Sequence, residues 1–318
     1  MGLFVLFAVA AVIVCAVVSG VLVYAMLNPP RKTFAVAVAK GGATDPADLG
    51  WSAEPITFSL TGGSSSPGWI IDGLEPSGPT ILVVHGFGDS RFGALTWTPL
   101  LIPLARRVVV FDLRGHGDSE ARYCQQGGVE TVDLIGVLDQ LNGSSEPADG
   151  QVVLFGYSMG AVIAIAAAAA APDRVAAVVA EGVYRHWQEP VRRLMRSKRL
   201  PVQPFLAIAG GVLRLAIRGQ SDFDRVEHAS RLRCPLLVLH GADDRLCPLE
   251  SARAIAAAAP NGRLEVFEGG GHLDLATVDS DRYTQVLGKL LAGVCQAGFS
   301  QQVGASSTAV AAKLARFG

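Results

Sequence analysis

Residues 152–170 read VVLFGYSMGAVIAIAAAAA, and the interpretation of the whole chain starts from them. A short apolar run is followed by GYSMG at 156–160, which fits the pattern G-x-S-x-G, and then by an alanine-rich run. The apolar run predicts a buried strand and the alanine-rich run predicts a helix, so the pattern lies at a sharp strand-to-helix turn. Such a turn exposes its central residue, and small neighbours relieve the crowding. We therefore expect Ser158 to be a nucleophile and not merely a helix cap.

A serine nucleophile needs a base, and the base needs a carboxylate that orients it. Of six histidines, His272 is the best base, because it lies in GGGH, a flexible loop after the last expected strand. His85 and His240 end strands and are expected to be structural. Asp243 and Asp244 both follow an apolar run at 236–239, so these residues alone leave the choice of acid open.

Short apolar runs alternate with helical patterns along most of the chain, which predicts a mostly parallel sheet with helices on both faces. We expect strands at 55–60, 69–72, 81–84, 108–111, 152–155, 175–180, 236–239 and 264–267. We expect helices near 94–105, 129–141, 159–171, 249–259 and 280–295. Residues 184–231 contain no clear strand, and an insertion of this length predicts a small helical cap.

Residues 2–27 form one apolar run without a charged residue. The run is long enough to cross a bilayer as a helix, and it is longer than the apolar part of a signal peptide. We expect residues 1–30 to be an uncleaved, single-pass transmembrane anchor; a cleaved signal peptide is the alternative. Arg31, Lys32 and Lys40 follow the run, which favours a cytoplasmic domain. Because no expected strand lies in the anchor, its removal is expected to leave a soluble, active domain.

The composition excludes several classes of protein. Of the 318 residues, 50% are hydrophobic and 17% are charged, which excludes a disordered chain. The net charge of −1 provides no basic surface for a nucleic acid. The 5 cysteines are scattered and form no CxxC pair, so neither a disulfide scaffold nor a structural zinc site is expected.

Five stretches together resemble the α/β-hydrolase family. In chain order they are HGFG at 85–88, DLRGHGDS at 112–119, GYSMG at 156–160, HGADDRLCP at 240–248 and GGGH at 269–272. The resemblance implies an α/β-hydrolase fold, which is a mostly parallel central sheet of about eight strands with helices on both faces. Here the fold would carry a small helical cap and follow one transmembrane helix. An anchor followed by a compact hydrolase domain is similar, more narrowly, to the membrane-anchored Bem46-like hydrolases.

The resemblance also implies roles for particular residues. Ser158 matches the family's nucleophile, His272 its general base and Asp244 its orienting acid. Asp244 is preferred to the preceding aspartate because it fits the family pattern G-x-x-D-x-x-x-P. HGFG resembles the family's oxyanion loop, so the backbone N–H groups of Phe87 and Met159 are expected to bind an oxyanion. No metal and no organic cofactor are expected.

The expected activity is hydrolysis of an ester, thioester or related acyl bond in a small molecule. Because the cap is rich in apolar residues and the anchor places the domain near a membrane, a lipid substrate is compatible with the sequence. A peptidase or amidase, an acyltransferase, and a non-catalytic membrane-bound scaffold are the alternatives. The expected division of the chain is an anchor at 1–30, a linker at 31–54, a hydrolase domain at 55–297 with its cap at 184–231, and a mobile tail at 298–318.

Overall fold

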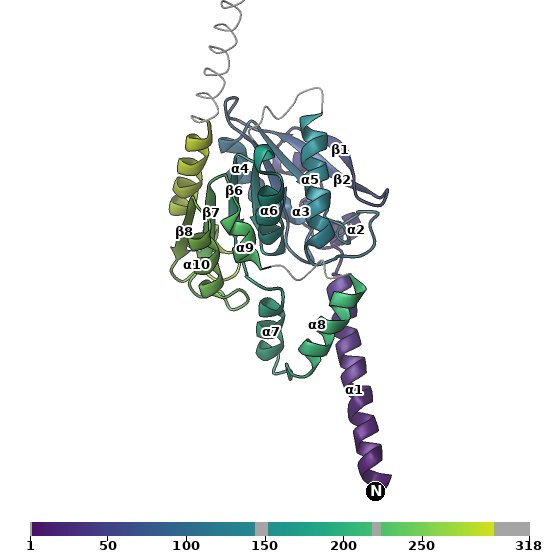
Figure 1. Ribbon diagram of the computed structural model, residues 1–318. Coiled ribbons are helices and arrows are strands. Elements are labelled where there is room, and N and C mark those ends of the chain that lie inside the picture. Colours follow the sequence, from purple (N-terminus) through teal and green to yellow (C-terminus); the bar gives the residue numbers. More distant parts are fainter. Residues whose placement is uncertain (1, 144–151, 218–223, 296–318) are drawn as a thin grey trace, which may run out of the picture.

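The computed structural model describes residues 2–143, 152–217 and 224–295, and its centre is an eight-stranded sheet (Figure 1). The strand order is β1-β2-β4-β3-β5-β6-β7-β8. The strands are Ala53–Ser59 (β1), Ser65–Asp72 (β2), Thr80–Val84 (β3), Arg107–Phe111 (β4), Val152–Tyr157 (β5), Ala177–Glu181 (β6), Leu236–Gly241 (β7) and Gly262–Phe267 (β8). The β1–β2 and β2–β4 pairings are antiparallel and the other five are parallel, which confirms the expected mostly parallel sheet.

The central strands are apolar on both faces because helices cover both. In β3, Leu82 and Val84 belong to one core cluster, while Ile81 and Val83 belong to the other. Side chains alternate between the faces of a strand, so a strand covered on both sides contains an uninterrupted apolar run.

The first face of the sheet is covered by four helices whose buried residues share one core cluster. They are Gly128–Asn142 (α5), Met159–Ala170 (α6), Arg225–Ser230 (α9) and Leu249–Ala258 (α10). A helix through residues 280–295 and four short turns of helix cover the second face. The short turns are Arg91–Ala94 (α3), Leu95–Trp97 (η2), Thr98–Leu101 (α4) and Ile102–Leu104 (η3). One continuous helix was expected here, but Pro99 and Pro103 lack the N–H that would continue it.

The helix Gly2–Leu27 (α1) projects from the domain, and the helices Gln188–Ser197 (α7) and Phe205–Ala216 (α8) extend in the same direction (Figure 1). α1 has 26 residues, and an 18-residue stretch of it has a mean hydropathy of 2.9, so by length and composition it could span a membrane. The expected cap contains α7 and α8, and α8 packs against α1. Ser19 Oγ of α1 donates a hydrogen bond to the carbonyl of Phe205 at 3.2 Å.

The carboxyl end of α1 is part of the domain core, which differs from the expected separable anchor. Val23 and Met26 are buried in the same cluster as α6 and α8. The side chain of Gln126 donates to the carbonyl of Met26 at 2.6 Å, and the backbone N of Cys124 donates to the carbonyl of Leu27 at 2.9 Å. Removal of α1 would therefore expose apolar surface and leave hydrogen-bonding groups of the domain without partners.

The segment at 31–54, expected as a linker, forms two short helices, Phe34–Ala39 (α2) and Pro46–Leu49 (η1), before β1. Arg31 donates to the carbonyls of Ser119 and Ala121, both at 2.8 Å. This segment therefore packs on the domain instead of connecting it loosely. The remaining helices are Pro172–Arg174 (η4) and Leu275–Val278 (α11). The domain limits at 30, 54, 184 and 231 stay predictions, and the expected tail at 298–318 lies outside the described residues.

Candidate active site

Ser158 occupies the sharp turn between β5 and α6, with φ 53° and ψ −120°. A residue other than glycine in this part of φ/ψ space is strained, and such strain is typical of functional sites. A Cβ added to Gly156 would lie 2.5 Å from the carbonyl oxygen of Gly160, and one added to Gly160 would lie 1.9 Å from that of Val84. The turn therefore needs glycine on both sides of the serine. The backbone N of Ser158 donates to the carbonyl of Glu181 at 2.8 Å.

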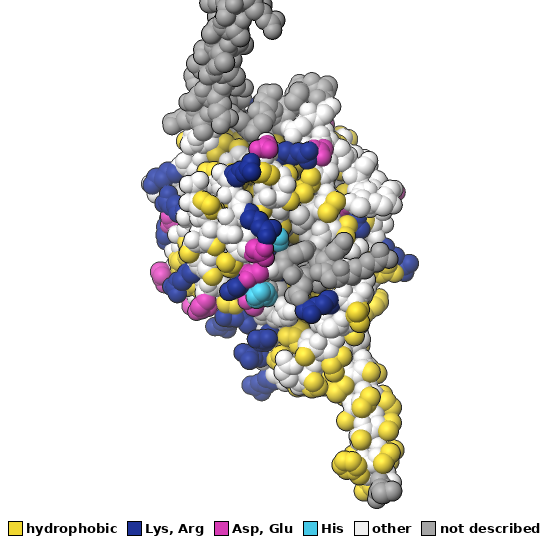
Figure 2. Space-filling model, in the orientation of Figure 1, with side chains coloured by type: hydrophobic (Ala, Val, Ile, Leu, Met, Phe, Trp, Pro, Cys, Tyr) yellow, Lys and Arg dark blue, Asp and Glu magenta, His cyan; other side chains and the backbone are white. Residues whose placement is uncertain are grey.

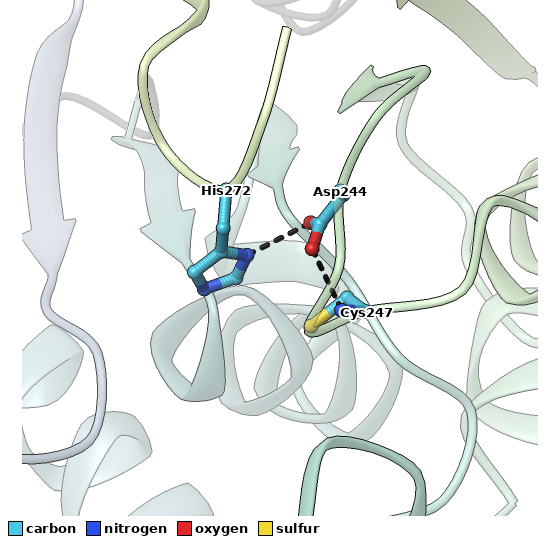
Figure 3. A group of neighbouring side chains, drawn as sticks. All are labelled: Asp244, Cys247 and His272. Carbon is cyan, nitrogen blue, oxygen red and sulfur yellow. Dashed lines mark hydrogen bonds and ion pairs between the residues drawn. The ribbon is translucent and has the colours of Figure 1, made fainter. Parts of the chain in front are cut away.

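Three of the predicted residues lie in a row at the carboxyl edge of the sheet. His272 Nδ1 lies 2.8 Å from Asp244 Oδ2, and His272 Nε2 lies 3.2 Å from Ser158 Oγ. Figure 3 shows the imidazole of His272, from the loop after β8, facing the carboxylate of Asp244, from the loop after β7. A carboxylate only accepts hydrogen bonds, so Nδ1 carries the hydrogen in a neutral imidazole and Nε2 is free to accept from the serine hydroxyl.

The environment of Asp244 keeps its carboxylate charged. Its side chain is 1% exposed, and this burial alone would raise its pKa. The hydrogen bond and the positive field from His272 oppose the burial, as do the backbone N–H groups of Leu246 and Cys247, which donate to Oδ1 at 2.7 and 2.8 Å. The net effect lowers the pKa of Asp244 below its ordinary value, so the residue is an acceptor at neutral pH.

The neighbouring Asp243 is placed differently. It is exposed, and its backbone N donates to the carbonyl of Gly270 at 2.8 Å. His240 is fully buried, its Nε2 lies 3.2 Å from the carbonyl of Cys247, and burial lowers its pKa. The geometry thus brings Asp244, and not Asp243, to the imidazole.

Asp244, Cys247 and His272 lie close enough to be considered as metal ligands (Figure 3). Their ligand atoms all lie within 4.8 Å of one another. Burial raises the pKa of the Cys247 thiol well above its ordinary value, so forming the thiolate that a metal would bind costs free energy here. Asp244 and His272 are also already bonded to each other. This donor set suits a hydrogen-bonded pair better than a metal centre.

The loop at 85–88 passes directly beside Ser158. A Cβ added to Gly86 would lie 3.2 Å from the Cβ of Ser158. His85 is fully buried and fixes the loop, because its Nδ1 lies 2.9 Å from the carbonyl of Gly86 and its Nε2 accepts from the backbone N of Leu113 at 2.9 Å. Within the described ranges, the backbone N–H groups of Phe87 and Met159 donate no hydrogen bond.

A cavity of 450 Å³ joins these groups. Ser158, Met159, Phe87 and His272 line one part of it. Apolar residues from the cap line another part, namely Trp187, Pro190, Val191 and Leu194. Mostly apolar walls with a few polar groups are typical of small-molecule sites.

Sequence reasoning missed a polar chain beside this cavity. Tyr157 Oη donates to Asp89 Oδ2 at 2.8 Å, and Lys32 Nζ lies 2.8 Å from Asp89 Oδ1. Through these contacts Asp89 links Tyr157, the residue before Ser158, to Lys32 in the segment that follows α1. Asp89 directly follows HGFG, and that position was the only signal in the sequence.

A sequence profile of the Alpha/beta hydrolase family matches residues 81–286, so this chain belongs to the α/β-hydrolase family. Uncharacterized protein Rv2307c of Mycobacterium tuberculosis is 28% identical over 204 residues, which cover 64% of this chain and 66% of that protein. Lysophosphatidylserine lipase ABHD12 of Macaca fascicularis is 26% identical over 221 residues, which cover 67% of this chain and 53% of that protein.

Among solved structures, the Pyrococcus furiosus esterase Pf2001 is similar, with a TM-score of 0.68 and 22% identity. The similarity covers 84% of this chain and 97% of the esterase, and it supports the fold. The chain spans just under two thirds of the length of Rv2307c and about half of the length of the ABHD12 lipase. The narrower similarity to Bem46-like hydrolases stays a prediction.

Proposed function

We propose that this chain is a membrane-anchored serine hydrolase that cleaves an ester, thioester or related acyl bond. The observation that carries the proposal is the series of contacts from Ser158 Oγ to His272 at 3.2 Å and from His272 to Asp244 at 2.8 Å, on the wall of an apolar cavity. In such a series the hydroxyl is the nucleophile, the imidazole is the base and the carboxylate orients the imidazole.

In the first half of the proposed reaction, Ser158 Oγ attacks the acyl carbon while His272 Nε2 takes the hydroxyl proton. The C–O or C–S bond to the leaving group then breaks, and His272 returns the proton to that group, which leaves an acyl ester on Ser158. Asp244 stabilises the imidazolium that forms in between. We assign the oxyanion to the backbone N–H groups of Phe87 and Met159, because both belong to the cavity wall and Met159 opens α6, whose amino end favours negative charge.

In the second half, a water molecule attacks the acyl carbon while His272 takes its proton. The acid product then leaves, and His272 gives the proton back to Ser158 Oγ. The enzyme returns to its starting state without a redox change.

The test compares two neighbouring aspartates in the full chain. Ser158→Ala should abolish labelling by a fluorophosphonate and lower kcat/KM for nitrophenyl esters by about four orders of magnitude or more. Asp244→Asn should lower kcat/KM by about four orders of magnitude, because the imidazole then loses the acceptor that fixes its tautomer. The matched control Asp243→Asn should stay near wild type. Equal losses in the two variants, or labelling that survives Ser158→Ala, would contradict the assignment, and preferential cleavage of aminopeptide substrates would indicate a peptidase.

We further propose that α1 crosses the membrane and that the hydrolase domain lies on the cytoplasmic side. Arg31, Lys32 and Lys40 after the helix support this orientation. A cysteine at the exposed position Glu250 should react with a membrane-impermeant maleimide only after cells are lysed. Reaction in intact cells would place the domain outside.

Four exposed basic residues on and after α7 support contact with anionic head groups, at the end of the domain from which α1 projects. They are Arg192, Arg196, Lys198 and Arg199, and Figure 2 shows Lys and Arg side chains gathered in this region. Arg193, which lies among them in the sequence, is not included, because its guanidinium donates to the carbonyl of Asp244 at 3.3 Å. Replacing the four by glutamine should remove any rise in activity when phosphatidylglycerol is added to phosphatidylcholine nanodiscs. A rise that persists would reject the contact.

A further inference from the structure

The cavity that contains Ser158 is not built from the hydrolase domain alone. Leu22, Ala25 and Met26, all on the last two turns of α1, also line it. They face the same space as the α7 residues Pro190, Val191 and Leu194. A segment with the composition of a membrane span therefore forms one wall of the site in which the acyl bond would be cleaved.

This wall is held in place and does not hang loosely beside the domain. Met26 and Leu27 accept hydrogen bonds through their carbonyls from Gln126 and Cys124. About two turns earlier in the same helix, Ser19 Oγ donates to the carbonyl of Phe205, the first residue of α8. Contacts at both ends of the segment fix which side of α1 faces the cavity.

On the same two turns, Ala25 is exposed as well as lining the cavity, and the neighbouring Val21 and Tyr24, which do not line it, face outward. Val21 is 61% exposed and Tyr24 is 68% exposed, so these two side chains would lie against lipid in a membrane. The last turns of α1 thus separate the outer surface of the molecule from the catalytic cavity by the width of a single helix.

We propose that α1 is part of the acyl-binding site, and that the substrate is an ester with a long acyl chain drawn from the bilayer. The proposal rests on the function proposed above, because it places the carbonyl carbon at Ser158 and the chain against α1 and α7. The occupant is assigned from the wall itself, since the α1 and α7 residues that line the cavity are apolar. Each methylene buried there raises kcat/KM about fourfold, until the cavity is full.

The test measures chain-length preference in the full protein in phosphatidylcholine nanodiscs. The readout is the ratio of kcat/KM for nitrophenyl octanoate to that for nitrophenyl acetate. Ala25→Phe places a ring in the cavity, and loss of room for two methylenes lowers the ratio roughly fifteenfold relative to wild type. The matched control Val21→Phe places the same ring one turn earlier, on a side chain that is 61% exposed and does not line the cavity, and its ratio stays at the wild-type value.

The outcomes separate this proposal from the proposed function. If wild type hydrolyses neither ester, the hydrolase assignment fails. If wild type hydrolyses both esters through Ser158 but Ala25→Phe keeps the wild-type ratio, only the role of α1 is refuted. An equal fall of the ratio in Ala25→Phe and Val21→Phe also refutes it, because the effect would then come from the membrane and not from the cavity. A fall confined to Ala25→Phe supports the shared site.

Discussion

Replacing the buried carboxyl of Glu181 by glutamine should make the stability of this protein less dependent on pH. Glu181 ends β6 and is fully buried, and Tyr283 Oη donates to its Oε2 at 2.6 Å. Burial is the main cause that raises the pKa of this carboxyl from 4.5 to about 8, with smaller contributions from the negative fields of Asp274 and Asp244. In the folded chain the group is therefore uncharged at neutral pH, and glutamine imitates that form.

The sign and size of the effect follow from the two pKa values. The unfolded chain loses this proton near pH 4.5, whereas the folded chain keeps it until about pH 8. The contribution of Glu181 to stability is therefore complete below pH 4.5 and is lost as the pH rises through about 8. The full shift corresponds to about 5 kcal/mol, and about 3 kcal/mol of it is lost between roughly pH 5 and 8.

The assay is denaturant unfolding of the full chain in detergent micelles at pH 5 and 8. Wild type should lose about 3 kcal/mol more than Glu181→Gln over this interval. Glu268→Gln, which removes an exposed carboxylate, serves as the control and should follow wild type. If Glu181→Gln loses as much stability as wild type between the two pH values, the carboxyl is charged in the folded state and the reasoning is wrong.

Three further perturbations test the packing. Gly160→Ala should give no folded protein, because its Cβ would lie 1.9 Å from a carbonyl of β3, whereas Gly136→Ala, with open space around it, should be recovered in normal yield with a wild-type circular dichroism spectrum. Asp112→Ala should lower the free energy of unfolding by about 3 kcal/mol, because the buried guanidinium of Arg91 loses one of its two carboxylates; denaturant titration measures this loss. Deletion of residues 1–30 should lower the Tm and the soluble yield, and a deletion variant as stable as the full chain would show that α1 adds nothing to the core.

Much of the sheet could be predicted from the sequence, because its central strands are short apolar runs. The helices at 129–141 and 159–171 were expected within one residue of α5 and α6. The helix at 94–105 was not predicted correctly, because prolines interrupt a pattern whose apolar spacing is otherwise helical. The turn at Ser158 was predicted because its glycines are required where the chain reverses.

The choice between Asp243 and Asp244 shows a limit of reasoning from residue types. The two residues are neighbours after the same strand. If the loop were shifted by one residue, Asp243 instead of Asp244 would face the imidazole. Only the resemblance to a family pattern selected Asp244, the residue that the structure brings to His272. The variants Asp243→Asn and Asp244→Asn test the roles of both residues in catalysis.

The docking of α1 could not be predicted for a different reason. The helix is apolar on every side, so it has no stripe to mark the face that meets the domain. Its partners, Gln126 and Phe205, follow about 100 residues or more later in the chain. Contacts over such separations leave no periodic pattern in the sequence.

The burial of Val23 and Met26 has a consequence for the order of events during synthesis. A ribosome produces α1 before every other element of the described chain, yet α6 and α8, which complete the core around its last turns, emerge much later. Throughout that interval one side of the helix lacks its final neighbours. The part of the cavity wall that α1 provides therefore stays unsupported until the middle of the chain has been made, and a ribosome that stalls before α8 leaves α1 without the helix that packs against it.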